Sequence, residues 1–161
     1  MSVDLSAFTV QELLGLTRET LAELQRRQVI RTLNAPAGDW AELIAATALR
    51  GVLAPNSEKS YDVVSGDGKR LQVKARMLDP NKVGSNILSA IRTWDFDELF
   101  VVLFDPGDFQ IRAAASIPAE IVRDYSSFSK HANAWRVRPT PDLLSRGVDW
   151  TDRVRAVAEA Y

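Results

Sequence analysis

The chain has 161 residues, of which 46% are hydrophobic and 25% are charged, with 20 Lys plus Arg against 21 Asp plus Glu. This length and composition predict one globular domain with a sizeable core, and they exclude global disorder, collagen-like repeats and coiled coils. Cysteine is absent and histidine occurs once, which excludes disulfides, thiolate metal sites and a cysteine nucleophile. Because the formal net charge is -1, nucleic acid could be bound only by a local basic patch.

The first residues include acidic side chains and no basic segment ahead of an apolar one, a pattern unlike a signal peptide. No apolar run approaches the ~20 residues that a membrane-spanning helix requires. We therefore expect a cytoplasmic protein that has no membrane partner.

The first predicted element is a helix over residues 9–30. Thr9 and Glu12 have the spacing of a capping box, and leucines follow at roughly helical intervals. The sequence NAPAG that comes next is predicted to break the helix and to act as a hinge. We therefore divide the chain into a helical extension, residues 1–35, and a main domain, residues 36–161.

A second helix is predicted over residues 39–50, with Asp39 as its cap and Gly51 as its stop. Nearly all sides of this helix are apolar, which is typical of a buried helix. Glu42 is an exception, since a carboxylate is seldom buried unless it is paired or bound to a metal. An acid in the first turn also interacts favourably with the helix dipole and can point outward, so both interpretations stay open.

A β-hairpin follows, with strands over residues 60–64 and 69–77 and a glycine-rich turn between them. If the turn is a three-residue loop, Asp62 lies opposite Gln72 and on the same face. Alternation in the second strand places Lys74 on that face as well. A shift of one residue in register would reverse the face.

The rest of the chain continues the alternation of strands and helices, which predicts an α/β fold. The predicted elements are a polar loop over 79–86, strands over 99–104 and 109–117, a helix over 118–125, an irregular stretch over 126–135, a short edge strand over 135–139 and a final helix over 149–161.

The hairpin carries the strongest chemical signal. Asp62 and the triplet from Gln72 to Lys74 combine an acid and an amine beside a helix that bears another acid. Carboxylates bind hard cations such as Mg²⁺, and an ammonium group can orient a water molecule or hold a phosphate oxygen. This combination suits the hydrolysis of a phosphodiester bond. The plainer interpretation is the ordinary polar face of a strand.

Taken in order, GDWAELIAATAL, SYDVV and RLQVKAR resemble the PD-(D/E)xK nuclease superfamily, which has the restriction-endonuclease-like fold. In that family a helix acid precedes an Asp at a strand end, and the next strand carries an acid, any residue and then Lys. Glu42, Asp62, Gln72 and Lys74 match in that order. The resemblance covers residues 36–125 and implies a mixed central sheet flanked by helices, with the N-terminal helix as an addition.

The resemblance implies a metal-dependent DNA endonuclease that acts in restriction or repair. Asp62 would ligate Mg²⁺, for which Mn²⁺ can substitute, together with the backbone carbonyl of Val73. Glu42 would ligate the metal or a water molecule, and Lys74 would position the attacking water. Gln72 completes the catalytic set. DNA is the implied partner, and a homodimer is also implied because many nucleases of this fold pair to cut two strands.

Two positions depart from the family pattern. Tyr61 stands where the family has proline, which is a mild change. Gln72 replaces the usual acid, so it offers an amide oxygen but no charge, and the metal affinity should fall. A non-catalytic nucleic-acid-binding module with the same fold is therefore an alternative. A third alternative is an interaction subunit that docks through its N-terminal helix.

Basic residues surround the predicted hairpin site, as contact with a phosphate backbone requires. We assign nucleic-acid binding to Lys59, Arg76 and Arg92, within a larger group that also contains Lys69, Arg70, Lys74 and Lys82. A second basic group could line a DNA groove, and it consists of Arg123, Lys130, His131, Arg136 and Arg138. Trp135, interleaved with them, is predicted to be a core residue. Both groups can also be read as ordinary solvated surface.

Overall fold

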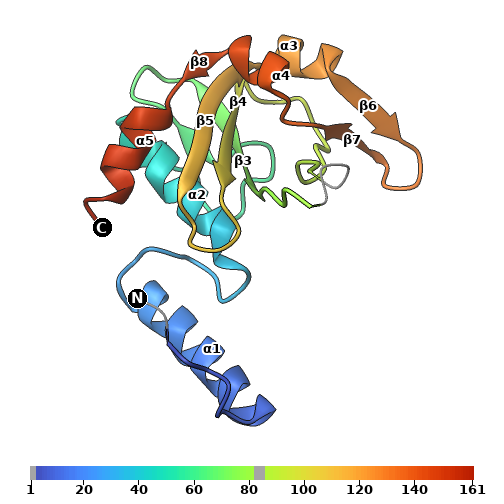
Figure 1. Cartoon of the computed structure of the whole chain (residues 1–161). Coiled ribbons are helices and arrows are strands. Elements are labelled where there is room, and N and C mark those ends of the chain that lie inside the picture. The colour runs from blue at the N-terminus through green and yellow to red at the C-terminus, as the bar shows by residue number, and fades with distance from the viewer. Residues whose placement is uncertain (1–2, 82–85) are drawn as a thin grey trace. The chain divides into compact units, whose positions relative to one another are not determined.

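The computed structural model describes residues 3–81 and 86–161 and divides the chain into two compact units, Met1–Trp40 and Ala41–Tyr161 (Figure 1). The division falls within helix α2 (Pro36–Ala48), slightly later than the boundary drawn from the sequence at residue 35. Lys82, one of the basic residues named above, lies outside the described residues.

The N-terminal unit contains helix α1 (Val10–Arg26), and the predicted capping box at its start is confirmed. The Glu12 N–H donates to Thr9 Oγ1 at 3.3 Å, and the Thr9 N–H donates to Glu12 Oε2 at 2.8 Å. The helix ends earlier than predicted, and Gln28 beyond it has a φ of 61°, which no helical residue adopts. No residue of α1 is buried. Its role in docking a partner or a second copy of the chain stays a prediction.

Helix α2 begins at Pro36, so the prediction that residues 34–38 (NAPAG) interrupt the helical structure was wrong for residues 36–38. Proline is favoured in the first turn of a helix, because its fixed φ is helical and its missing N–H would be unpaired there anyway. Asp39 therefore lies inside the helix and does not cap it. Its Oδ2 accepts the N–H groups of Arg31 and Thr32, each at 2.7 Å, and so holds the preceding loop.

Gly51 does not end α2 in the way predicted. The residue in the left-handed region is Arg50, with a φ of 51°, and the Gly51 N–H donates to the Ala46 carbonyl at 2.8 Å. This is a Schellman ending, with an arginine where glycine is usual. Gly51 is required for another reason, since a Cβ built on it would lie 2.2 Å from the Val64 carbonyl oxygen.

The main sheet has six strands in the order β1-β2-β3-β4-β5-β8. β3 and β4 are parallel, and every other neighbouring pair is antiparallel. The strands are β1 (Val52–Leu53), β2 (Val63–Val64), β3 (Arg70–Met77), β4 (Glu98–Phe104), β5 (Ile111–Pro118) and β8 (Val148–Asp149). The fold is therefore mixed α/β, with a mostly antiparallel sheet flanked by helices. β1 and β8 are only two residues long, and the sequence pattern did not indicate them.

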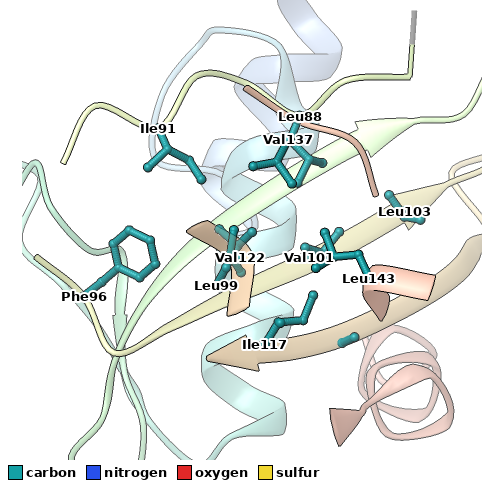
Figure 2. Close-up of a cluster of buried hydrophobic side chains, with 11 residues drawn as sticks. Leu88, Ile91, Phe96, Leu99, Val101, Leu103, Ile117, Val122, Val137 and Leu143 are labelled. Atoms are coloured by element: carbon teal, nitrogen blue, oxygen red, sulfur yellow. The ribbon is translucent and has the colours of Figure 1, made fainter. Parts of the chain in front are cut away.

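β4 is buried on both faces, as its unbroken apolar sequence predicted. Leu99 and Val101 join the cluster shown in Figure 2, which also takes in residues of helices α3 (Ala119–Asp124) and α4 (Pro141–Ser145). Phe100 faces the other way, and its ring lies 6.3 Å from that of Trp150, next to helix α5 (Thr151–Ala158).

The stretch predicted to be irregular is a β-hairpin. β6 (Ser126–Ser129) and β7 (Ala134–Val137) form a separate two-stranded sheet. The predicted edge strand is thus paired with β6, which was not predicted because a short strand with three serines carries a weak strand signal. An isolated bridge between Ile91 and Trp135 joins β7 to the segment that precedes β4.

Among the described residues, none of the helices combines the length and the apolar character that crossing a bilayer demands.

Candidate active site at the β2–β3 hairpin

The predicted register is confirmed at the turn of the hairpin. The Ser65 N–H donates to the Lys69 carbonyl at 2.9 Å, and Gly68 in the turn has a φ of 87°, which favours glycine. Val63 pairs with Leu71, and this is the last regular pair of the ladder. The Asp62 N–H also donates to the Leu71 carbonyl, so the expected pairing of Asp62 directly opposite Gln72 is not among the pairs of this ladder.

Asp62 is hydrogen-bonded to β3, the strand that carries Gln72 and Lys74. Its Oδ2 accepts the Val73 N–H at 2.7 Å, and its own N–H donates to the Leu71 carbonyl at 2.8 Å. The side chain therefore extends the pairing with β3 at the residue before β2 begins. A carboxylate held by a backbone donor has a fixed orientation, which is what a ligand or a general base requires.

Gln72 is buried, with a relative exposure of 6%. Its Nε2 donates to the Ser60 carbonyl at 3.3 Å, which leaves Oε1 buried without a hydrogen-bond partner in the described structure. An unpaired buried acceptor costs free energy, and such groups in folded proteins call for an explanation such as a bound water or ion. Gln72 thus offers an oxygen at the position next to Val73, whose N–H binds Asp62.

Lys74 lies two residues further along β3 and is largely buried. Its Nζ donates to the Ala90 carbonyl at 3.4 Å. Burial lowers the pKa of this amine, and the negative charges of Asp62 and Glu42 only partly offset that effect. Arg92 lowers the same pKa further through charge repulsion, so it too lies within electrostatic range of Lys74.

Glu42 reaches this group from α2. The helix buries Ala41, Ile44 and Ala45, and Glu42 is half-buried beside them. Its influence on the pKa of Lys74 means that the helix acid and the strand amine share one electrostatic environment. Glu42 from α2 and Asp62 from the position before β2 therefore both act electrostatically on Lys74 of β3, the strand that also carries Gln72.

The three residues predicted to bind nucleic acid lie on three different segments of the chain. Lys59 is exposed in the loop between β1 and β2. Arg76 is half-buried on β3, and Arg92 is exposed in the segment that supplies the Ala90 carbonyl. Arg92 is tied electrostatically to the site through its effect on the pKa of Lys74.

Two contributors to the site were missed from the sequence. They are the Ser60 and Ala90 carbonyls, which accept hydrogen bonds from Gln72 and Lys74. Every non-proline residue carries such a carbonyl, so no residue type marks these positions.

A hard divalent cation such as Mg²⁺ requires oxygen ligands, above all carboxylates. Within residues 3–81 and 86–161, no group of three or more His, Cys, Asp or Glu side chains is placed to hold a metal ion. The site offers two carboxylates, Glu42 and Asp62, and the unpaired oxygen of Gln72. Mg²⁺ is commonly held by one or two carboxylates and several waters, so these residues fit a site of modest affinity.

Comparison with known proteins adds no assignment, since no protein-family model matches the chain and no curated protein has a significantly similar sequence.

Proposed function

We propose that this chain is a metal-dependent deoxyribonuclease with a PD-(D/E)xK site on a restriction-endonuclease-like core. The observation that carries the proposal is the buried, unpaired Oε1 of Gln72, next in the chain to Val73, whose N–H binds the Asp62 carboxylate. An oriented carboxylate and an ammonium group next to it supply the remaining requirements for phosphodiester hydrolysis. The parallel pairing of β3 with β4 and the helix after Pro118 support the same core.

Each residue has a defined part in this proposal. Asp62 and Glu42 would hold Mg²⁺ or Mn²⁺, with the Gln72 amide oxygen and the Val73 carbonyl as further oxygen donors. The bound cation would lower the pKa of a water molecule and neutralise charge that develops on the phosphate. Lys74, held by the Ala90 carbonyl, would orient the attacking water and stabilise a phosphate oxygen.

The test is cleavage of supercoiled plasmid and single-stranded DNA with Mg²⁺, with Mn²⁺ or with EDTA. We expect cutting with either metal, none in EDTA, and a loss of at least about 10²-fold in Asp62→Asn. Asp152→Asn is the matched control, because Asp152 is an exposed carboxylate on α5. Cleavage that persists in EDTA, or that Asp62→Asn leaves unchanged, would rule out this site.

A nucleic-acid-binding module that has lost the reaction is the second candidate. The neutral side chain of Gln72 favours it, since the described residues contain no three-acid group. This module would bind DNA in a salt-sensitive manner and would not cleave it, whichever divalent metal is supplied.

Gln72→Glu separates the two candidates. A third negative charge should tighten metal binding and raise cleavage about tenfold or more at limiting Mg²⁺, because ligand charge sets the affinity for hard cations. The measurement is the initial cleavage rate against the Mg²⁺ concentration. If neither wild type nor Gln72→Glu cuts DNA at any metal concentration, the binding module is the better description.

A further inference from the structure

The β6–β7 hairpin presents aromatic rings and cations together. Phe128 pairs with Trp135 across the hairpin, and their rings meet edge to face with centroids 5.3 Å apart. Trp94 stands 5.8 Å from Trp135, and the guanidinium of Arg123 lies 5.8 Å from the Trp135 ring and 5.9 Å from the Trp94 ring. We call these four residues, Trp94, Arg123, Phe128 and Trp135, the aromatic patch.

Burial differs across the aromatic patch. Trp94 and Trp135 pack against the buried cluster of Figure 2 and so have fixed positions, although neither is fully buried. Phe128 is 49% exposed, although a ring of this size is favoured in the core. The patch therefore has a rigid base and an open aromatic face.

The β6–β7 hairpin itself carries cations. Residues 125–141 contain Lys130, Arg136 and Arg138 and no carboxylate, and Asp124 and Asp142 flank this stretch on either side. Lys130 and Arg136 are exposed, and within the described residues neither forms an ion pair with a carboxylate. Cations next to open aromatic rings suit a chain of phosphates with accessible bases.

The aromatic patch is connected to the candidate active site by backbone pairing. The Ile91 N–H donates to the Trp135 carbonyl at 3.0 Å, and the Trp135 N–H donates to the Ile91 carbonyl at 2.8 Å. The carbonyl of Ala90, the residue before Ile91, accepts a hydrogen bond from the Lys74 ammonium. One segment thus contacts both the patch and the proposed catalytic lysine.

We infer that the β6–β7 hairpin and its aromatic patch bind a single-stranded segment of DNA next to the active site, with bases stacked on Phe128 and phosphates held by Arg136 and Lys130. This inference rests on the proposed function, which makes DNA the substrate. A single strand is favoured over duplex because an exposed ring can stack only on a base that is free of its own stack.

The test is fluorescence anisotropy with a labelled oligothymidylate of about 15 nucleotides, measured in EDTA so that no cleavage occurs. Phe128→Ala should weaken binding about tenfold, and Phe128→Tyr, which keeps the ring, should bind like the wild type. Arg136→Ala should lower the slope of log K against log salt by about 0.7, whereas Phe128→Ala should leave that slope unchanged. Phe109→Ala and Arg153→Ala, which change exposed side chains outside the patch, are the matched controls.

The inference is overturned if the wild type fails to bind the oligonucleotide, if Phe128→Ala binds it like the wild type, or if duplex of the same length binds as tightly. Failure of the proposed function gives a different result. In that case binding depends on Phe128, but no divalent metal supports cleavage. The converse result is also distinct. If Asp62→Asn abolishes metal-dependent cleavage but Phe128→Ala does not change binding, the proposed nuclease function stands and the DNA-binding role of the aromatic patch is rejected.

Discussion

Replacing Lys74 by methionine is expected to reduce DNA cleavage by about 10²- to 10³-fold while it raises the stability of the fold. Methionine keeps the length and volume of the side chain but removes the charge. Burial of the ammonium lowers the pKa of Lys74 by more than the nearby carboxylates raise it, so the charged form is disfavoured in the folded chain. Removing the charge should therefore raise the free energy of unfolding.

Two measurements on the same variant check this prediction, namely the rate of plasmid nicking and the urea concentration at half-unfolding. Arg153→Met is the control, since Arg153 is exposed on α5 and should change neither quantity appreciably. A Lys74→Met protein that is less stable than the wild type would show that the attraction of the Asp62 and Glu42 charges outweighs the cost of burial. A variant that cuts DNA at the wild-type rate would remove Lys74 from the mechanism.

Gly51→Ala is expected to lower the free energy of unfolding by about 3 kcal/mol. The added methyl would lie 2.2 Å from the Val64 carbonyl oxygen and 2.9 Å from the Ser65 Cα. Both are backbone atoms held in the hairpin, so neither can move aside without disturbing β2 and the adjacent Asp62. The loss of stability should therefore be accompanied by a loss of cleavage.

Thermal unfolding of Gly51→Ala and Gly107→Ala provides the comparison. A Cβ on Gly107 would meet nothing within 4 Å, and we expect a change within about 0.5 kcal/mol there. If the two variants unfold at the same temperature, the close approach at Gly51 is not a constraint on stability. A small and equal change in the free energy of unfolding at both positions would mean that Gly51 is needed only as the residue that follows helix α2.

Much of the candidate site was predictable because its geometry depends on short-range rules. The turn between Ser65 and Lys69 sets the register of the hairpin as far as the pair of Val63 with Leu71. The alternation of side chains in β3 then places Gln72 and Lys74 on one face of the strand. The capping box at Thr9 and the helix after Pro118 were predictable for the same reason, since each depends on neighbours within four residues.

The features that were missed depend on contacts between distant residues. β6 has weak strand propensity, and the hairpin that it forms with β7 is supported by the bridge from Trp135 to Ile91, more than 40 residues earlier in the chain. Pro36 and Asp39 were misassigned because proline and glycine two residues apart indicate a turn locally, whereas the apolar residues of α2 favour a buried helix.

The sequence by itself determined the hairpin register, the order of the acid, glutamine and lysine positions, and the α/β class, because turn chemistry and side-chain alternation are local. Only the tertiary structure decided that Lys74 is buried against the Ala90 carbonyl, that Gln72 has an unpaired oxygen, and that Arg123 packs on two tryptophans. Burial and electrostatic environment are properties of packed neighbours. Those neighbours come from segments that only the folded chain brings together.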